Sequence, residues 1–190
     1  GRLALFVGRM IPAKGVDVLL EAQAELRKHH ADARLLLCGD GPQRAAYEAL
    51  AKKLGVADSV IFAGAVQQAD LPHLYALADV FVLPSTYHHA DGSEIPFVSE
   101  NFGLVIAEAM SCETPVVAAN VGGIPLWIDD NKVARLFTER DAVMLAGKLE
   151  DAMYDVKGDN ARLVRAAKQM IEDKYSWEAV IRQFAPLFKK

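Results

Sequence analysis

Five short apolar runs, separated by longer segments with helical periodicity, restrict the fold of this sequence more than any other feature. The runs lie at residues 3–7, 35–38, 60–63, 80–83 and 116–119. They are apolar at successive rather than alternate residues, which is typical of strands covered on both faces in a parallel sheet. The remaining segments predict helices at residues 16–29, 43–54, 70–78, 103–112, 140–155, 159–173 and 176–188. The sequence therefore predicts an α/β fold with helices on both faces of a parallel sheet.

The chain has the size and composition of one folded domain. It has 190 residues, of which 52% are hydrophobic and 24% are charged, and it has no internal repeat or Pro/Gly/Ser-rich linker. We therefore expect a single domain over residues 1–190. The formal net charge of −4 gives no reason to expect nucleic acid as a partner. The last helix, with Ser176 as its expected N-cap, is predicted to pack away from the sheet.

Cysteine usage and the length of the apolar segments indicate a cytoplasmic protein. Cys38 and Cys112 have neither zinc-site nor redox-pair spacing, so both are expected to be reduced core residues. No apolar segment reaches the roughly 18 residues that a membrane-spanning helix needs. The chain opens directly on an apolar run without an initiator Met, so we expect it to be a domain of a longer protein.

The loop at residues 8–15, GRMIPAKG, follows the first apolar run and is a candidate phosphate site. It departs from the P-loop pattern, because Ala13 stands at the second glycine position and Gly15 stands where Ser or Thr would bind magnesium. An ATPase is therefore not predicted. The loop places two cations, Arg9 and Lys14, at the positive end of a helix dipole. They are either ordinary surface charges or the ligands of a shared anion such as a diphosphate.

The loop at residues 38–44, CGDGPQR, matches the dinucleotide fingerprint G-x-G-x-x-G only in part. Arg44 occupies the third glycine position, and no acidic residue ends the next apolar run at residues 60–63. Binding of NAD is therefore not predicted. Gly39 and Gly41 fit a tight turn into a helix as well as they fit contact with a ligand.

The predicted helix at residues 103–112 is apolar or small on nearly every side except at Glu108, so we expect it to be buried with one carboxylate inside. Its first amides, those of Gly103, Leu104 and Val105, have no helical partner and are available to an anion. An unpaired buried carboxylate is costly, so Glu108 needs partners. Two vicinal hydroxyls of a ribose would serve, one for each oxygen, and so would an Arg or a backbone amide of the protein itself.

Several segments, taken in order, resemble one protein family. They are VGRMIPAKGVDVLLEA, LLLCGDGPQR, VIFAGAV, LYALADVFVLPS and ENFGLVIAEAMSCETPVVAANVGGIP. They are similar to the nucleotide-binding C-terminal half of retaining glycosyltransferases with the GT-B architecture, in the family numbered 4. The resemblance covers about residues 3–130 and YSWEAVIRQF near the end, and includes the glutamate pair Glu100 and Glu108. It implies a Rossmann-like domain that forms one half of a GT-B architecture.

The resemblance implies catalytic roles for three residues. Arg9 and Lys14 would neutralise the diphosphate leaving group of a nucleotide diphosphate sugar. Glu100 would position the donor sugar during attack from the front face, with the leaving phosphate taking the acceptor's proton. The product would be a hexose transferred with retention of configuration.

The resemblance also implies a set of donor-binding residues. Glu108 would hold the ribose hydroxyls. The donor sugar would face Asn101, Phe102 and Gly103 together with Glu100; the amides of Leu104 and Val105 would complete the phosphate site; and the strand end at Ala65 and Val66 would lie against the base.

The resemblance further implies a metal-independent enzyme with no cofactor besides the donor substrate. No D-x-D triplet occurs in the sequence, so a metal-bridged diphosphate site has no obvious ligands. The expected partners are the nucleotide sugar, a sugar or lipid-linked acceptor, and a missing N-terminal domain toward which the helices at about residues 159–190 would pack. Without that domain the chain is expected to be inactive. A peripheral contact with the inner face of the membrane, if the protein makes one, is expected through the absent half.

Some residues depart from the family pattern. The loop at residues 86–99, TYHHADGSEIPFVS, is longer than usual and is expected to lie over the sugar site. Its His88 and His89 are expected to be solvated rather than to bind a metal. Glu113 stands where the family often has a glycine, which costs about 1 kcal/mol if the backbone there is left-handed.

Two other functions remain open from the sequence. A nucleotide-sugar epimerase or a phosphorylase can share the same architecture, since fold does not fix function. A non-catalytic nucleotide-binding module is the other alternative. The base, the sugar, the acceptor and the oligomeric state are not identified by the sequence.

Overall fold

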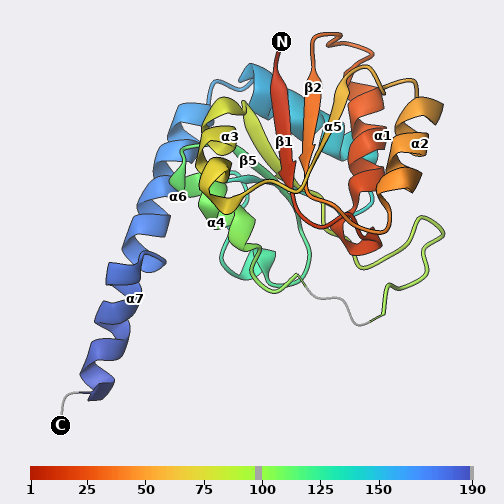
Figure 1. The fold of residues 1–190 in the computed structure, drawn as a ribbon. Helices are drawn as coiled ribbons and strands as arrows, with labels where there is room; N and C mark the ends of the chain where they lie inside the picture. The colour runs from red at the N-terminus through yellow and green to blue at the C-terminus, as the bar shows by residue number, and fades with distance from the viewer. Residues whose placement is uncertain (97–99, 189–190) are drawn as a thin grey trace.

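The computed structural model describes residues 1–96 and 100–188 and contains a parallel sheet with six strands. Their order across the sheet is β3-β2-β1-β4-β5-β6, as in a doubly wound Rossmann-like domain. The strands are β1 (Leu3–Val7), β2 (Arg34–Cys38), β3 (Val60–Gly64), β4 (Val80–Leu83), β5 (Val116–Ala119) and β6 (Arg135–Phe137). The predicted fold class is therefore confirmed (Figure 1).

Helices cover both faces of the sheet, as the sequence predicts (Figure 1). On one face, α1 (Val16–Leu26) packs between α2 (Arg44–Lys53) and α5 (Ala142–Tyr154). On the other, α4 (Leu104–Ser111) packs between α3 (Leu71–Leu77) and α6 (Asn160–Lys174). All of these helices begin and end within a few residues of the predicted limits.

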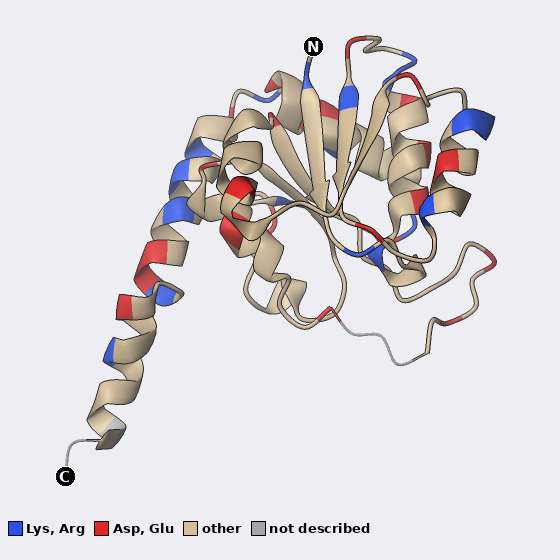
Figure 2. Ribbon diagram, viewed as in Figure 1, with Lys and Arg blue, Asp and Glu red and all other residues tan. Residues whose placement is uncertain are grey.

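The chain ends in a helix that lies away from the sheet. Helix α7 (Trp177–Phe184) follows α6 and is continued by the short 3-10 turn η4 (Ala185–Phe188). Ser176 caps α7 as expected, because its hydroxyl accepts a hydrogen bond from the amide of Ala179 at 3.1 Å. Figure 2 shows charged residues along α6 and the start of α7, whereas the final described turn is uncharged.

How deeply each strand is buried depends on its position in the sheet. All four residues of β4 and of β5 are buried, because these central strands have neighbours and helices on every side. The edge strand β3 alternates, and Ile61 in it is exposed. The continuous apolar runs in the sequence therefore mark the centre of the sheet most clearly.

The sixth strand was not among the predicted runs. Strand β6 has three residues and contains Arg135, so it lacks the apolar signature of the others. Its neighbour β5 pairs with it in parallel register, and the buried Arg135 side chain forms an ion pair with Asp159 at the start of α6. The strand is thus defined by contacts that the local sequence does not encode.

Two predictions of burial are corrected by the structure. Helix α4 is not buried on every side, because only Ile106, Ala109 and Met110 are fully buried and Leu104 is largely exposed. Cys38 is a buried core residue as expected, but Cys112 at the end of α4 is only partly buried. Both cysteines are free thiols.

The end of α4 has the strained backbone that the sequence suggested. Glu113 has a φ of 60°, in the left-handed region that favours glycine. Its carboxylate forms an ion pair with Lys168 of α6. Glutamate is therefore kept at a position whose backbone conformation would suit glycine better.

Candidate nucleotide-sugar site

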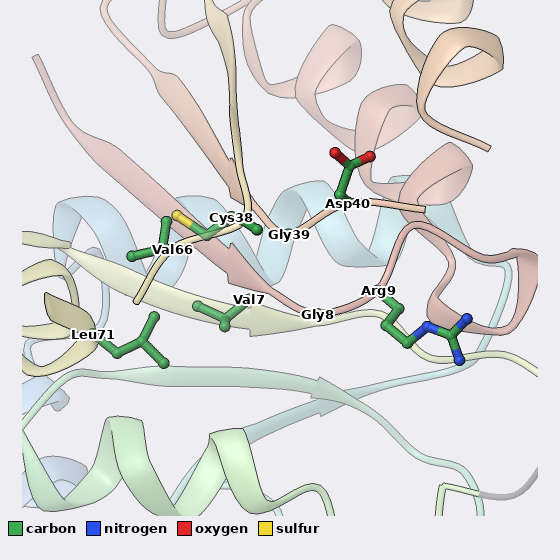
Figure 3. A pocket seen from close by; sticks show the side chains of 9 residues that line it. Val7, Gly8, Arg9, Cys38, Gly39, Asp40, Val66 and Leu71 are labelled. Carbon is green, nitrogen blue, oxygen red and sulfur yellow. The ribbon is translucent and has the colours of Figure 1, made fainter. Parts of the chain in front are cut away.

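A pocket of about 270 Å³ lies at the carboxyl ends of β1, β2 and β3 (Figure 3). Ligands of doubly wound sheets bind at this edge, where the strand-to-helix loops gather. The pocket has an apolar part made by side chains from the three strand ends and the start of α3, namely Val7, Cys38, Val66 and Leu71. Arg9 lines the opposite part, as Figure 3 shows. Asp40 also lines the pocket and forms an ion pair with Arg44 at 3.6 Å. The pocket therefore offers an apolar surface at one end and, at the other, the cation Arg9, which is unpaired among the described residues, and the paired carboxylate Asp40.

The floor of this pocket depends on a close approach between the loops after β1 and β2. The amide of Met10 donates to the carbonyl of Asp40 at 2.9 Å, and the amide of Gln43 donates to the carbonyl of Met10 at 3.1 Å. A Cβ at Gly39 would lie 1.8 Å from the carbonyl oxygen of Gly8, and Gly39 has a φ of 134°. Only glycine fits there, so the bend of this loop has a structural cause.

The two predicted cations have different surroundings. Arg9 is exposed and forms no ion pair within the described part of the chain. Lys14 instead donates to Oε2 of Glu100 at 2.5 Å, and its side chain is 26% exposed. The structure thus brings Lys14 and Glu100 into direct contact, and it places Arg9 with Val66 and Ala65 around the pocket.

Glu100 is held in place by both its side chain and its backbone. Its Oε2 also accepts a hydrogen bond from the Ser85 hydroxyl at 2.7 Å. Its amide donates to the Tyr87 hydroxyl at 3.2 Å, and its carbonyl accepts from the amide of Gly123 at 2.8 Å. A Cβ at Gly123 would lie 1.6 Å from the carbonyl oxygen of Asn101, so this glycine allows the segment after β5 to support residues 100–101. The carboxylate is buried and preorganised by these contacts.

The start of α4 presents backbone amides at the same edge of the sheet. Gly103, with a φ of 71°, precedes the helix, and its carbonyl accepts from the amide of Ile106 at 2.8 Å. No hydrogen bond to the amides of Leu104 and Val105 is found in the described residues. These two amides are therefore in the position expected of an anion-binding helix N-terminus.

The Phe102 ring takes part in an aromatic cluster. It stacks on Trp127 with ring centroids 4.4 Å apart and meets Tyr175 edge to face at 5.3 Å. The Trp127 indole also donates to the carbonyl of Phe102 at 3.0 Å. The cluster fixes the segment between Glu100 and α4, next to Asn101, which is itself exposed.

Glu108 is half-buried and has a protein partner that the sequence did not reveal. Its Oε2 accepts a hydrogen bond from the Tyr75 hydroxyl of α3 at 2.8 Å. Burial and the adjacent Glu108 carboxylate raise the pKa of Tyr75 well above its ordinary value, so the hydroxyl keeps its proton and acts as the donor. The partner is thus neither an Arg nor a backbone amide, and Oε1 has no hydrogen bond to any residue that the structure describes.

Lys14, Glu100 and Glu108 do not line the pocket between β1, β2 and β3. The predicted residues therefore form two groups at one edge of the sheet, one around the pocket and one around α4. Sequence reasoning missed Tyr75 and Ser85, which hold the two glutamates. Each lies on another element of the fold, so no local spacing indicated the pairing.

The long loop after β4 is anchored by a residue that sequence reasoning also missed. Glu139 accepts hydrogen bonds from the Thr86 hydroxyl at 2.9 Å and the Tyr87 amide at 2.8 Å, and Nδ1 of His88 lies 2.8 Å from its other oxygen. Burial raises the pKa of Glu139, but these hydrogen bonds outweigh burial and leave the pKa below its ordinary value. Residues 97–99 of the predicted loop lie outside the described residues.

No group of three His, Cys, Asp or Glu side chains suited to a metal ion occurs in residues 1–96 and 100–188. His88 contacts Glu139, and the pair has no third side chain of that kind. The same residues contain no helix long and apolar enough to cross a membrane.

Comparisons with known proteins identify relatives of the chain. Residues 1–170 match the family model described as Glycosyl transferases group 1. A GDP-mannose-dependent alpha-(1-6)-phosphatidylinositol monomannoside mannosyltransferase of Mycolicibacterium smegmatis is 32% identical over 171 residues, which are 90% of this chain and 43% of the relative. A D-inositol 3-phosphate glycosyltransferase of Salinispora tropica is 34% identical over 198 residues, covering 99% of this chain and 38% of the relative. The chain thus spans less than half the length of these relatives.

Solved structures show the same architecture. The Anabaena protein HepE in complex with UDP has a TM-score of 0.82 and 26% identity, covering 97% of this chain and 48% of HepE. The C-terminal domain of a group 1 family glycosyl transferase from Francisella tularensis has a TM-score of 0.77 and 22% identity, covering 93% of this chain and 87% of that domain. The second similarity shows the fold alone. Together with the family match, it confirms the predicted resemblance to one half of a GT-B architecture.

Proposed function

The chain belongs to the group 1 glycosyl transferases, and from this membership we propose that it binds a nucleotide diphosphate sugar and transfers the hexose, with retention, to an acceptor. The relatives it matches are more than twice its length, so we assign part of the acceptor site, but not all of it, to a further, N-terminal domain. One of those relatives is named as GDP-mannose-dependent and another for D-inositol 3-phosphate, and the structure of HepE contains UDP. GDP-mannose and UDP both contain a nucleoside diphosphate.

The observation that carries this proposal is the division of the pocket between β1, β2 and β3 into an apolar part and a polar part with Arg9, whose neighbour Asp40 is paired with Arg44 (Figure 3). A nucleoside diphosphate has the same division, with a flat base at one end and phosphates at the other. The base would lie against Val66 and its neighbours, and the phosphates would extend past Arg9 toward the amides of Leu104 and Val105. Arg9 suits this role because it has no ion pair with any described residue to give up.

Glu108 supports the proposal through its available oxygen. The Tyr75 hydroxyl fixes one carboxylate oxygen at 2.8 Å, which orients the side chain, while Oε1 is left for a ligand. A ribose hydroxyl is a suitable donor to such an oxygen. Tyr75 is then a positioning residue that holds Glu108 without touching the nucleotide.

The Lys14–Glu100 pair supports a mechanism without a metal ion. When the donor binds, the Lys14 ammonium would move from Glu100 to the diphosphate, where it and Arg9 stabilise the charge that develops on the leaving group. Glu100, still held by Ser85, would then accept hydrogen bonds from the donor sugar. The bond between the anomeric carbon and the phosphate oxygen breaks, the acceptor oxygen bonds to the same face of that carbon, and the acceptor proton passes to the leaving phosphate.

The face of α7 and η4 supports the presence of a second domain. Trp177, Ile181, Phe184 and Phe188 recur at helical spacing, and each is more than half exposed. We assign this stripe to contact with the missing N-terminal domain, since the relatives contain more than half their length outside the matched region. The chain alone would then bind donor but transfer little.

Calorimetric titration with UDP, GDP and ADP tests the proposed donor site. We expect at least one of them to bind, and we expect Arg9→Ala to weaken that binding about tenfold, because a charged hydrogen bond to phosphate is worth roughly 1.5–3 kcal/mol. Glu108→Gln retains an acceptor for Tyr75 but loses charge at the ribose, and we expect a smaller loss, of about fivefold.

Matched controls separate these effects from general changes in charge. Arg165→Ala and Glu172→Gln alter exposed residues of α6 and should leave nucleotide affinity unchanged. If both Arg9→Ala and Glu108→Gln bind nucleotide as tightly as the parent chain, the proposed donor site is wrong.

A further inference from the structure

A second and larger pocket, of about 580 Å³, lies beside the long loop after β4. It shares no lining residue with the pocket between β1, β2 and β3. We call it the loop pocket; its polar side chains come from the starts of α1 and α2 and from the long loop, namely Asp17, Gln43, Tyr47, His89, Asp91 and Ser93. In Figure 1 the long loop stands beside the ends of α1 and α2 that face the ligand-binding edge of the sheet.

Tyr47 is the residue in the loop pocket that most needs an explanation. Its side chain is packed in the core, with only 5% of the residue exposed, yet its hydroxyl forms no hydrogen bond with any described residue. The hydroxyl is not among the buried atoms without a partner, so it reaches the open space of the pocket. The hydroxyl is held in place by the buried ring and has no described protein partner, so it is free to donate to or accept from a ligand in the pocket.

Asp17 lies near Tyr47 and lines the same pocket. Its Oδ2 accepts a hydrogen bond from Nη1 of Arg140 at 2.7 Å, whereas Oδ1 is buried and has no partner in the described chain. Burial, followed by the Asp17 carboxylate, raises the pKa of Tyr47, so its hydroxyl remains protonated. Of the two side chains, it is the Tyr47 hydroxyl that this wall of the loop pocket offers to a ligand.

The opposite wall is an ordered turn of the long loop. The Asp91 carboxylate accepts from the Ser93 amide at 2.9 Å and from its hydroxyl at 2.6 Å. The His89 amide donates to the carbonyl of Ser93 at 2.8 Å. Glu139 holds the start of the same loop through Thr86, as described above. The wall is therefore a defined surface built by several hydrogen bonds.

The charges of the residues that line the loop pocket disfavour an anionic ligand, because Asp17 and Asp91 are acidic and no Lys or Arg is among them. The described part of the long loop contains Asp91 and Glu94 but no Lys or Arg, as Figure 2 shows by its red segments. Arg140, which contacts Asp17, is paired with that carboxylate. The carboxylates disfavour a phosphate, whereas the hydroxyl groups of a sugar can donate to the exposed Asp91 carboxylate and accept from Tyr47 and Gln43.

We propose that the loop pocket binds a neutral or amino-substituted sugar ring of the acceptor, with Tyr47 as the residue that determines its affinity. This inference rests on the proposed transferase function. The long loop leaves β4 after Ser85 and returns at Glu100, and these two residues are hydrogen-bonded to each other at 2.7 Å. Pro12, which lines the pocket, lies two residues before Lys14. The loop pocket is thus built partly from a loop that begins and ends beside Glu100, and its volume is in the range of ordinary ligand sites.

Titration of the isotope-labelled 190-residue chain, followed by backbone amide NMR, tests this inference. The probes are D-mannose, D-glucose and D-glucosamine, with inorganic phosphate as the anionic probe. We expect at least one sugar to shift the amide signals of Gln43, His89 and Ser93 in a saturable way and phosphate to leave them unchanged. Tyr47→Phe should weaken that sugar's affinity about five- to tenfold, because one hydrogen bond is lost while the ring remains.

The control variant is Tyr154→Phe, which removes a hydroxyl bound to Asp32 on a different part of the surface and should leave the sugar affinity unchanged. Thermal unfolding of Tyr47→Phe should match that of the parent chain, because its hydroxyl has no described partner to lose. The inference is overturned if no sugar shifts these signals, if Tyr47→Phe binds sugar as tightly as the parent, or if phosphate saturates the same signals.

The test also separates this inference from the proposed donor site. Addition of UDP or GDP should shift the amides of Gly39 and Val66, and Tyr47→Phe should not alter nucleotide affinity. Shifts by sugar without shifts by any nucleotide would overturn the proposed donor site and leave the sugar pocket standing. Nucleotide shifts at Gly39 without any sugar effect would overturn the sugar pocket alone.

Discussion

The loops after β1 and β2 and the long loop after β4 lie at the same edge of the sheet but are held in different ways. The first two are joined by backbone hydrogen bonds and by a contact at Gly39 that admits no side chain. The long loop is held mainly by side chains, above all by Glu139, which lies 53 residues after Thr86 in the chain. A loop shaped by its own backbone can be anticipated from nearby glycines, whereas a loop fixed by a distant carboxylate cannot.

The largest expected effect is at the backbone contact between the first two loops. Gly39→Ala places a Cβ 1.8 Å from the carbonyl oxygen of Gly8, in a backbone conformation that alanine rarely adopts. We expect the free energy of unfolding to fall by about 3 kcal/mol or more, measured by urea denaturation. A loss below about 1 kcal/mol would mean that these loops can separate, and the contrast with the long loop would fail.

Gly147→Ala is the matched control for this substitution. Gly147 lies inside α5, and a Cβ there would meet no atom within 4 Å. We expect a gain in stability of about 0.5–1 kcal/mol, because alanine loses less conformational entropy in a helix. A loss of stability in Gly39→Ala and a gain in Gly147→Ala would show that the close approach of the two loops at Gly39, and not the presence of a glycine as such, shapes the floor of the pocket.

The second-largest loss of stability is expected at the Lys14–Glu100 ion pair, which joins the loop after β1 to the end of the long loop. Lys14→Met removes the ammonium from Glu100 and leaves that buried carboxylate with the Ser85 hydroxyl as its one side-chain donor among the described residues. We expect a loss of about 2 kcal/mol at pH 7, since a buried charged acceptor loses its main partner. Lys14→Met combined with Glu100→Gln should recover part of the loss, and a double variant no more stable than Lys14→Met would contradict a pairwise interaction.

Substitution of Glu139 is expected to cause a smaller loss of stability, and only in the long loop. Glu139→Gln weakens the hydrogen bonds to Thr86 and Tyr87 and the contact with His88, and we expect opening of the loop to become easier by about 1 kcal/mol. Hydrogen exchange at the amides of Tyr87 and His89 measures this. Exchange at Gly39 should not change, because the first two loops do not depend on Glu139.

The same contact predicts a pH dependence with a defined sign. The pKa of Glu139 in the folded protein lies below its ordinary value of 4.5, so the ionised form is favoured by folding. Its contribution to stability is therefore complete above about pH 4.5 and is lost as the pH falls through the lowered pKa. Exchange at Tyr87 should rise in that acid range, and the rise should be absent in Glu139→Gln.

The smallest change in stability is expected at Glu113, where an ion pair of the side chain opposes strain in the backbone. Glu113→Gly relieves the left-handed conformation at a φ of 60° and removes the contact with Lys168. Since an exposed ion pair contributes little, we expect a net gain in stability below about 1 kcal/mol by thermal unfolding. A loss of stability instead would show that the contact outweighs the strain.

Much of the fold and part of the candidate site could be predicted from the sequence. The continuous apolar runs identified the central strands, and the helix at residues 103–112 was placed because its periodicity is local. Strand β6 escaped prediction, because Arg135 is buried through a contact with Asp159 that only the folded chain creates. The partner of Glu108 was not predicted either, since Tyr75 lies 33 residues away on another helix.

The sequence by itself determined the α/β class, the helices that flank the sheet, and the loops that gather at its carboxyl edge, because these depend on apolar periodicity and glycine over short stretches. Only the tertiary structure decided that Lys14 contacts Glu100, that Tyr75 holds Glu108, and that Glu139 fixes the long loop. Side chains far apart in the chain meet only after the sheet has placed their elements. Their pairing therefore depends on packing that no local pattern records.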